Sequence, residues 1–265
     1  MYTYLKSLAK VLIHNYLKVL PIYVNDYWLY INPSLYWLTP KMFIGIYDTY
    51  EIEVFKKLVK EGWVVCDIGA AVGYYSIIAS NKVGNTGKVY AFEPDPYTFK
   101  LLQKNIRLYN LKNVYPEQIA IADKKGAVAF YQSETHPWDN RLINPPDQKR
   151  KKIYIRQDTL DNLLKGIRRV DLVKMDVQGV EERCLDGMTK IINSNKKIIL
   201  YIELWPRGLK EAGSNTKRFL DKLTGLGFKI YVLNTIEKRV VLFKNLDELL
   251  NLVNWLGYVD IICKR

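Results

Sequence analysis

Cysteine and histidine are scarce in this chain, and their scarcity excludes several kinds of site. The sequence of 265 residues contains three cysteines and two histidines. Cys66, Cys184 and Cys263 lie far apart and form no metal-type pair, and two of them fall in apolar strand-like runs, where buried thiols are common. We therefore expect a reducing, intracellular setting without a disulfide framework. A multi-histidine metal site is not expected either, and no metal is assigned.

The sequence also lacks an apolar stretch of the length that spans a membrane, which is roughly 18 residues. Its N-terminus alternates basic and apolar residues and lacks the compact apolar core of a secretory signal. No internal repeat is found. We therefore expect a cytoplasmic protein, with peripheral contact at the inner membrane surface as the alternative.

What the chain does contain is an ordinary globular composition, with 49% hydrophobic and 25% charged residues. A chain of this length can bury a substantial core, and it suits one large α/β domain with a modest extension. We expect residues 1–47 to form the extension and residues 48–265 to form the main domain.

The formal net charge of +13 points to acidic partners such as nucleic acid, anionic lipid or a phosphorylated glycan. A lysine-rich solvated surface would give the same charge without any partner. Because no nucleic-acid-binding motif accompanies the charge, nucleic acid is a possible but not a favoured partner.

Residues 2–20 have the pattern of an amphipathic helix that ends at Pro21. One face is apolar and another is basic and free of acids; the apolar face holds Leu5, Leu8, Ala9, Leu12, Tyr16 and Leu20, and the basic face holds Lys6, Lys10, His14 and Lys18. The favoured interpretation is a helix packed across the main domain, and the alternative is a helix lying on anionic lipid. Two apolar runs around Asn25-Asp26 then predict a β-hairpin over residues 21–31.

From residue 51 onward, predicted helices and strands alternate. The predicted strands are 63–67, 88–93, 114–120, 127–131, 170–176, 197–203, 228–233 and 258–263, and the predicted helices are 50–60, 73–82, 97–109 and 215–225. A polar loop is expected from 132 to 152. Alternation of this kind predicts an α/β fold in which a mostly parallel sheet has helices on both faces.

The strongest local signal is Asp67-Ile-Gly-Ala-Ala-Val-Gly73, directly between a predicted strand and a predicted helix. Gly69 and Gly73 allow a tight turn and a close approach to a ligand, and the helix N-terminus offers unpaired N–H groups. A dinucleotide fingerprint would have glycine at position 71, where this chain has alanine. The spacing therefore favours a nucleoside that carries an amino-acid tail over a dinucleotide.

Acids follow the next two strands. Glu93 is placed to accept hydrogen bonds from both hydroxyls of a ribose, whereas Asp95 suits a helix cap. Asp123 is placed to accept a hydrogen bond from the exocyclic amine of adenine, although acids in such turns are often structural. Together with the glycine turn, these residues predict a site for an adenine nucleoside.

At these residues the chain resembles the FkbM-type methyltransferases of the class I S-adenosylmethionine-dependent superfamily. The resemblance runs from about Gly45 to about Val232. It is carried by Asp48-Thr-Tyr-Glu51, Cys66-Asp-Ile-Gly-Ala-Ala-Val-Gly-Tyr-Tyr-Ser76, Phe92-Glu-Pro-Asp-Pro96 and Val173-Lys-Met-Asp-Val-Gln-Gly-Val-Glu181. It implies a Rossmann-like fold with a mostly parallel seven-stranded sheet and an antiparallel last strand.

The resemblance also implies S-adenosylmethionine as cofactor and O-methylation of a sugar, a glycan or another small hydroxylated metabolite. Glu51 matches a family acid expected near the amino-acid end of the cofactor. Gln178 stands where the family usually has an acid, so it receives no catalytic or metal role. The predicted cofactor-binding residues are Glu51, Asp67, Gly69, Ala70, Gly73, Glu93, Pro94, Ala122 and Asp123.

Asp176 and Glu203 are the leading candidates for an active-site acid or base. Each closes a buried strand at the carboxyl edge of the sheet, where ligands of open α/β folds bind. His136 is an alternative base, although a lone loop histidine is more often an ordinary surface residue. Trp138 and Asn140, in the same loop, are predicted to contact the methyl acceptor.

Three rival functions are less well supported by the sequence. An RNA methyltransferase on the same fold would explain the charge, but Asn144-Pro145-Pro146 lies at the wrong spacing to be the motif of amino-methylating enzymes. A non-catalytic, membrane-attached cofactor-binding protein would explain the basic N-terminus, but not Asp176. A dehydrogenase would require the missing glycine at position 71.

Overall fold

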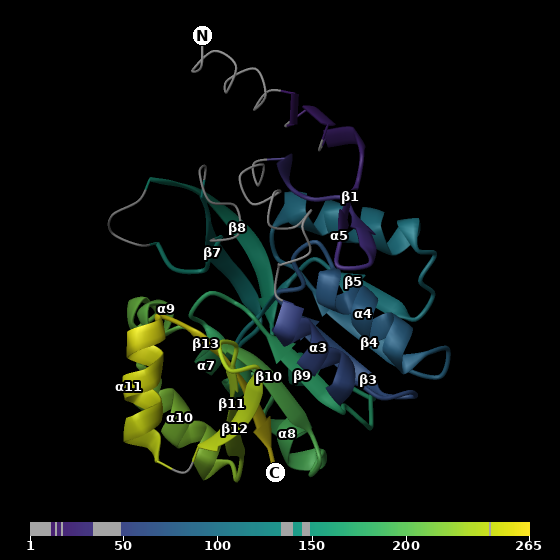
Figure 1. Cartoon of the computed structure of the whole chain (residues 1–265). Coiled ribbons are helices and arrows are strands. Elements are labelled where there is room, and N and C mark those ends of the chain that lie inside the picture. The colour runs from purple at the N-terminus through teal and green to yellow at the C-terminus, as the bar shows by residue number, and fades with distance from the viewer. Residues whose placement is uncertain are drawn as a thin grey trace.

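The computed structural model describes residues 12–13, 15–16, 18–33, 49–133, 140–144, 149–243 and 245–265. Within this part of the chain, the central sheet has eight strands in the order β12-β11-β13-β10-β9-β3-β4-β5 (Figure 1). Five neighbouring strands are parallel: β5 (Val114–Glu117), β4 (Lys88–Phe92), β3 (Val64–Ile68), β9 (Leu172–Met175) and β10 (Ile199–Leu204). Their carboxyl ends therefore meet at one edge of the sheet.

The other end of the sheet contains the antiparallel strand that the sequence predicts. The last strand, β13 (Val259–Lys264), lies between β10 and β11 (Lys229–Asn234) and is antiparallel to both. The fold is thus Rossmann-like, as expected. An eighth strand, β12 (Arg239–Phe243), pairs antiparallel with β11 and extends the predicted seven-stranded sheet at its edge.

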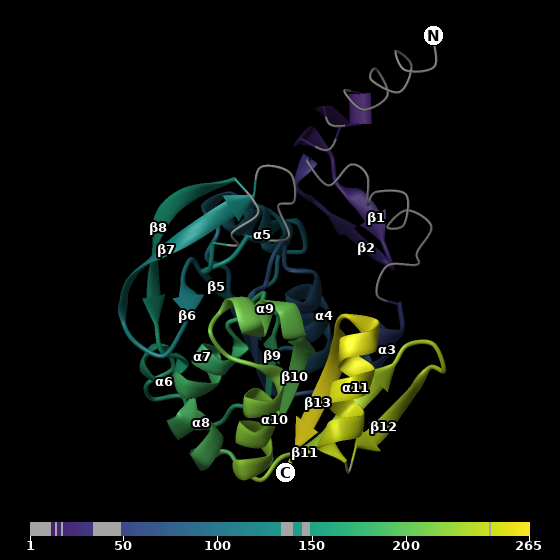
Figure 2. The ribbon, with the colours of Figure 1, turned by 90° about the vertical axis from the view of Figure 1, so that its left-hand side faces the viewer.

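Helices cover both faces of the sheet (Figures 1 and 2). One face carries α3 (Thr49–Leu58), α4 (Tyr74–Val83) and α5 (Pro96–Leu108). The opposite face carries α6 (Leu160–Leu163), α7 (Glu181–Asp186), α8 (Thr189–Ser194), α9 (Pro206–Glu211), α10 (Thr216–Gly225) and α11 (Leu246–Leu256). The strands feed both layers because their side chains alternate: in β10, Leu200 and Ile202 face the second layer, whereas Tyr201 faces the first.

The predicted hairpin is present as β1 (Ile22–Val24) and β2 (Tyr27–Leu29). Asn25 and Asp26 both adopt positive φ angles in its two-residue turn, as hairpin turns of this length require. Asn105 of α5 anchors the hairpin, because its Oδ1 accepts from the Tyr30 N–H at 2.7 Å and its Nδ2 donates to the Tyr30 carbonyl at 3.0 Å.

A second, three-stranded sheet stands beside the main one, in the order β6-β8-β7 (Figure 2). It consists of β6 (Ala120–Ile121), β7 (Gly126–Ser133) and β8 (Arg150–Asp158). The predicted polar loop over 132–152 is wrong at both ends, since β7 runs to Ser133 and β8 begins at Arg150. The basic start of β8 reads as loop because its first side chains are solvent-facing, while eight residue pairs with β7 hold it extended.

The residues described between positions 12 and 19 are helical, as predicted, but they do not pack across the main domain. The side chains of Leu12, Ile13, Tyr16 and Val19 are exposed, and this segment projects beyond the hairpin (Figure 1). Among the helices that the structure describes, none is long and apolar enough to cross a bilayer.

Candidate active site

A cavity of about 690 Å³ lies at the carboxyl ends of the parallel strands. Ile68 of β3, Phe92 of β4 and Met175 of β9 line it, and each is the last residue of its strand or precedes the turn that follows. The hairpin and the smaller sheet contribute further walls through Leu29 and Phe130. The cavity therefore occupies the crevice where open α/β sheets bind their ligands, with a volume typical of a small-molecule site.

The predicted glycine turn forms one wall of this cavity. Gly69 has φ +77°, and a Cβ atom added there would lie 1.9 Å from the carbonyl oxygen of Asp176. Gly73 has φ +90° and precedes α4, where a Cβ atom would lie 2.5 Å from Leu102 Cδ1. Ala71, at the position of the missing glycine, adopts φ +49°. The turn thus packs closely against its neighbours at its two glycines, and Gly69, Ala70, Ala71 and Val72 line the cavity.

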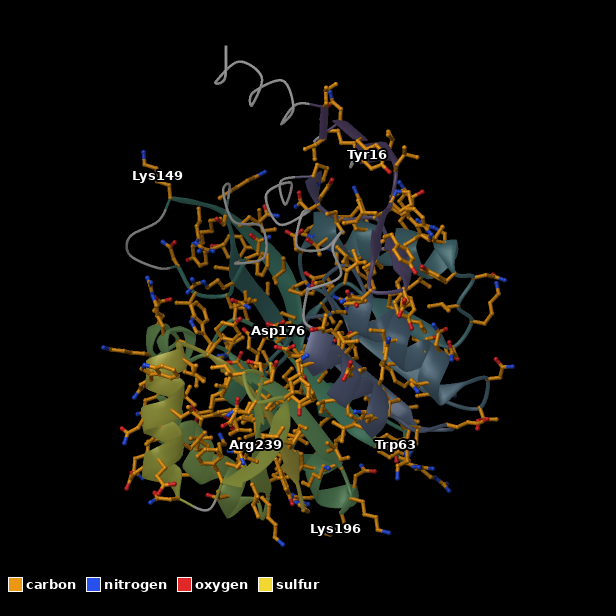
Figure 3. The ribbon with its side chains drawn as sticks, viewed as in Figure 1. Tyr16, Trp63, Lys149, Asp176, Lys196 and Arg239 are labelled. Carbon is orange, nitrogen blue, oxygen red and sulfur yellow. The ribbon has the colours of Figure 1, made fainter. Side chains whose placement is uncertain are left out.

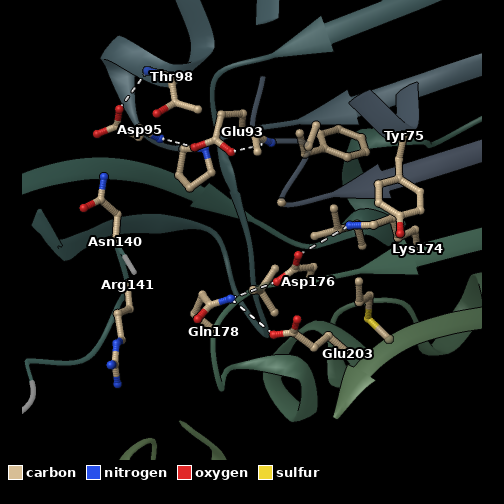
Figure 4. A pocket seen from close by; sticks show the side chains of 18 of the residues that line it. Tyr75, Glu93, Asp95, Thr98, Asn140, Arg141, Lys174, Asp176, Gln178 and Glu203 are labelled. Carbon is tan, nitrogen blue, oxygen red and sulfur yellow. Dashed lines mark hydrogen bonds and ion pairs between the residues drawn. The ribbon is translucent and has the colours of Figure 1, made fainter. Parts of the chain in front are cut away.

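Glu93 lies beside this turn, at the end of β4 (Figure 4). Its Oε2 accepts from the Ala71 N–H at 2.9 Å, and its Oε1 accepts from the Asp95 N–H at 2.8 Å. Burial raises the pKa of Glu93 to about 8, against the opposing effect of these two N–H donors. Each oxygen keeps a second lone pair, so the carboxylate is fixed in place and can still accept hydrogen bonds from a ligand.

Three of the acids singled out in the sequence form hydrogen bonds with other residues of the protein. Asp67 is buried, and its Oδ2 accepts from the Ser76 hydroxyl at 2.6 Å, so it fastens the start of α4 to β3. Asp95 caps α5 by accepting from the Thr98 N–H at 2.8 Å, as expected.

Asp123 also points away from the cavity, since its Oδ1 is 2.9 Å from Arg183 Nε. Partial burial raises the pKa of Asp123, but the hydrogen bond from Arg183, a backbone hydrogen bond and the positive charges of Arg183 and Lys124 together outweigh this and lower it overall. The neighbouring Ala122 is buried and donates its N–H to the Asp158 carbonyl. In this structure Asp123 is therefore ion-paired with Arg183 and is not part of the cavity wall, and its adenine-binding role stays a prediction.

The remaining residues predicted to bind the cofactor line the cavity or lie directly behind its wall. Glu51, in the first turn of α3, lines the cavity with Ala70 and Pro94. Gly73 lies behind the lining and positions the turn rather than facing the cavity.

A second wall carries the two acids predicted for catalysis. The side-chain amide of Gln178 links them: its Nε2 donates to Asp176 Oδ1 at 3.0 Å and to Glu203 Oε1 at 3.3 Å (Figure 4). Burial raises the pKa of Glu203 well above its ordinary value, and the nearby carboxylates of Asp176 and Asp260 raise it further. Gln178, which has φ +56°, thus holds two carboxylates in one orientation toward the cavity.

A buried lysine completes this wall. Lys174 Nζ is 3.8 Å from Asp67 Oδ1 and 3.7 Å from Asp176 Oδ2, and it lies over the ring of Tyr75 at 4.6 Å. Burial lowers the pKa of Lys174, but the surrounding carboxylates, led by Asp176 and Asp67, outweigh it and raise the pKa overall. Lys174 is therefore a buried positive charge that lies between the carboxylates of Asp67 and Asp176.

A third wall faces these carboxylates (Figure 4). Asn140 lines it, with its Oδ1 accepting from the Ser133 N–H at 2.7 Å. Arg141 forms an ion pair with Glu211 and lies 4.7 Å over the ring of Trp205. The other two predicted residues of this loop, His136 and Trp138, lie outside the residues that the structure describes.

The family follows from comparison with known proteins. A family model described as the methyltransferase FkbM domain matches residues 67–230, which is more than half of the chain. The chain belongs to this family. It is 23% identical over 188 residues to Methyltransferase 1 of Beauveria bassiana, covering 62% of this chain and 73% of that protein.

A second relative of this FkbM-family chain is the hexuronic acid methyltransferase AglP of Haloferax volcanii, with 27% identity over 145 residues, covering 54% of this chain and 57% of that protein. Among solved structures, Methyltransferase FkbM from Methylobacillus flagellatus matches with a TM-score of 0.48 and 15% identity, over 88% of this chain and 54% of that one. The chain thus spans little more than half the length of these two proteins.

Two further acids were not singled out from the sequence. Asp260 of β13 lies opposite Glu203 in the strand pairing and lines the cavity. Glu181 is buried behind Gly179, and burial raises its pKa to about 7. Lys174, a lysine inside an apolar strand, was the one feature of the sequence that could have indicated buried acids nearby. Within the described residues, no group of three or more His, Cys, Asp or Glu side chains is arranged to hold a metal ion.

Proposed function

We propose that the protein is an S-adenosylmethionine-dependent methyltransferase that methylates a hydroxyl group on a sugar, a glycan or another small hydroxylated metabolite. The observation that carries this proposal is that one cavity joins the Gly69 turn and Glu93 to the linked carboxylates of Asp176 and Glu203. The Gly69 turn and Glu93 suit the binding of a nucleoside, and the carboxylates of Asp176 and Glu203 suit removal of a proton from an acceptor. The name of the relative AglP, a hexuronic acid methyltransferase, supports a sugar-class acceptor.

The residues of the first wall fit this cofactor. The absence of a side chain at Gly69 lets the turn pack against the Asp176 carbonyl at the edge of the cavity, and the two free lone pairs of Glu93 match the two hydroxyls of a ribose. Glu51 supplies a carboxylate for an ammonium group. When bound, S-adenosylmethionine would supply an electrophilic methyl group on a positively charged sulfur.

Glu203 is the better of the two candidates for general base. A base acts best when its pKa lies near the working pH, and burial together with neighbouring carboxylates moves the pKa of Glu203 upward in that direction. Glu203 would take the proton from the acceptor hydroxyl while the oxygen of that hydroxyl attacks the methyl carbon. Its pairing with Gln178 fixes the carboxylate while this happens.

Asp176 then has a positioning role. Its side chain is held from two sides, by Lys174 at 3.7 Å and by Gln178 at 3.0 Å, and it remains partly exposed to the cavity. In this arrangement Asp176 would accept a hydrogen bond from the acceptor and keep the pKa of Glu203 raised.

The test is methyl transfer from radiolabelled S-adenosylmethionine to a panel of uronic acids, neutral glycosides and small hydroxylated metabolites. With the acceptor that reacts, we expect Glu203→Gln to lower kcat by about a hundredfold or more while S-adenosylhomocysteine still binds. The wild-type rate should rise with pH as Glu203 ionises, and the variant should lose that rise. Glu237→Gln, on the exposed turn before β12, is the matched control and should behave as wild type. An unchanged kcat in Glu203→Gln would remove Glu203 as the base.

A further inference from the structure

The exposed apolar side chains of this protein gather at its N-terminal end. In the helical stretch before the hairpin, Leu12 and Val19 are 61% and 63% exposed, and Tyr16 and Leu20 lie on the same helix face. On the hairpin, Tyr23 and Trp28 are directly paired across the two strands, with ring centroids 5.4 Å apart, and are 45% and 50% exposed. We term the exposed side chains of these six residues the N-terminal surface.

The N-terminal surface is held on a firm base. The hairpin side chains that point the other way, including Ile22 and Leu29, are buried against the α3–α5 layer. The N–H of Trp28 donates to the Tyr109 hydroxyl at 2.5 Å, and Asn105 binds both backbone groups of Tyr30. The exposed rings of Tyr23 and Trp28 therefore project from a packed hairpin. Their burial in a partner would remove apolar area from water at little cost in conformational entropy.

The charge around the N-terminal surface is positive. Residues 1–28 contain three lysines and one acidic residue, Asp26 in the hairpin turn. The start of β8 adds Lys149-Arg150-Lys151-Lys152, of which the three lysines are exposed. Lys149 and Tyr16 lie at the same end of the molecule, opposite Lys196 and Arg239 (Figure 3). Exposed apolar and aromatic side chains at an end of the molecule that also carries lysines match the interface of an anionic bilayer, where Trp and Tyr settle at headgroup level.

We infer that the N-terminal surface docks on an anionic lipid bilayer. Nucleic acid would use the lysines but leaves Leu12 and Val19 without a purpose, because it is bound chiefly through phosphate contacts and base stacking. The inner side of the same hairpin lines the cavity through Val24 and Leu29. A bilayer bound to the outer side of the hairpin would thus be separated from the cavity only by the hairpin itself. The inference concerns binding and stands apart from the identity of the methyl acceptor.

The test is flotation of the full chain with vesicles of phosphatidylcholine alone or mixed with an equal part of phosphatidylglycerol. We expect binding to the mixed vesicles that weakens as salt is raised. The double variant Leu12→Glu/Val19→Glu should lower the partition coefficient roughly tenfold or more. Trp28→Glu should lower it independently. Ile236→Glu, which changes a 72% exposed side chain in the turn before β12, is the matched control and should bind as wild type.

The inference is overturned if the wild-type chain does not float with the mixed vesicles, or if the double variant floats equally well. It is also overturned if the same substitutions abolish a gel shift with RNA, or convert a dimer to a monomer in light scattering, while the wild type ignores vesicles. Thermal unfolding of each variant establishes that the substitutions leave the fold intact.

Discussion

Gly69 is the residue on which the cofactor site depends most directly. Any side chain at this position needs an unfavourable positive φ and meets the Asp176 carbonyl oxygen at 1.9 Å, which is backbone and cannot move aside cheaply. We predict that Gly69→Ala lowers the free energy of unfolding by about 3 kcal/mol or more and abolishes S-adenosylhomocysteine binding.

The matched control for this substitution is Gly227→Ala. Gly227 has φ +83°, similar to Gly69, but a Cβ atom there meets nothing within 4 Å. The strain of the positive φ alone should cost about 1 kcal/mol and leave binding intact. Equal effects of the two substitutions in urea unfolding would contradict the role assigned to the close approach at Gly69.

Glu93 links cofactor binding to pH. Its pKa of about 8 means that the folded protein without ligand holds a proton on this group at neutral pH, whereas ribose hydroxyls need the ionised form as acceptor. Binding therefore releases a proton, and affinity for S-adenosylhomocysteine should rise with pH, by up to about tenfold per unit below pH 8.

The check is calorimetric titration between about pH 6 and pH 8.5 with wild type and Glu93→Gln. The ligand's own titration is common to both proteins, so only the difference between them reports on Glu93. A pH slope that persists unchanged in Glu93→Gln would show that Glu93 does not couple to the ligand.

The positions of acids after predicted strands indicate the site, but they do not indicate which side chains those acids bind. Glu93 and Asp176 follow parallel strands, Glu203 is the last residue but one of another, and all three line one cavity. Asp123 follows a strand too, but Arg183, 60 positions later, binds its carboxylate. Asp260 was missed because its strand is antiparallel, so the acid stands near the start of the strand and not at its end.

At the scale of elements, the hairpin and α5 support the cavity together. Asn105 is fully buried and makes three hydrogen bonds, two to Tyr30 and one to the Val72 carbonyl at 2.7 Å. Val72 and the hairpin both line the cavity. We predict that Asn105→Ala costs about 2 kcal/mol of stability, because it leaves buried backbone groups without partners, and that it also weakens S-adenosylhomocysteine binding.

Asn113→Ala provides the comparison. Asn113 likewise makes three hydrogen bonds, to Ser80 and to the Gly84 carbonyl, but it lies away from the cavity. Its loss should cost a similar stability without a change in affinity. If both variants bind equally well in calorimetry, the hairpin does not help to shape the cofactor site.

The elements themselves were predictable where periodicity was strong. The alternating run from β3 to α5 matches the structure to within a few residues, because apolar strands and amphipathic helices each follow their own period. The strands β8 and β12 were not predicted. Basic residues fill the start of β8, and β12 is an edge strand whose side chains are exposed or only partly buried. Both are held by antiparallel pairing, which a local pattern does not reveal.

At the scale of the whole molecule, the sheet order explains why one cavity holds both halves of the chemistry. Since β3 lies between β4 and β9, the cofactor turn after β3 has Glu93 on one side and Asp176 on the other. The hairpin closes the same crevice from the N-terminal extension, so the extension expected over residues 1–47 is part of the site through Val24 and Leu29. The identity of an acceptor depends on these added walls, which no fold-level pattern specifies.

The central claim is that this cavity binds S-adenosylmethionine, and calorimetric titration of the full chain with S-adenosylhomocysteine, beside NAD, tests it most directly. The account predicts micromolar binding of S-adenosylhomocysteine that Gly69→Ala abolishes, and no binding of NAD, because Ala71 replaces the glycine that a pyrophosphate needs. A folded sample that binds NAD, or that gives no heat with S-adenosylhomocysteine, would contradict it.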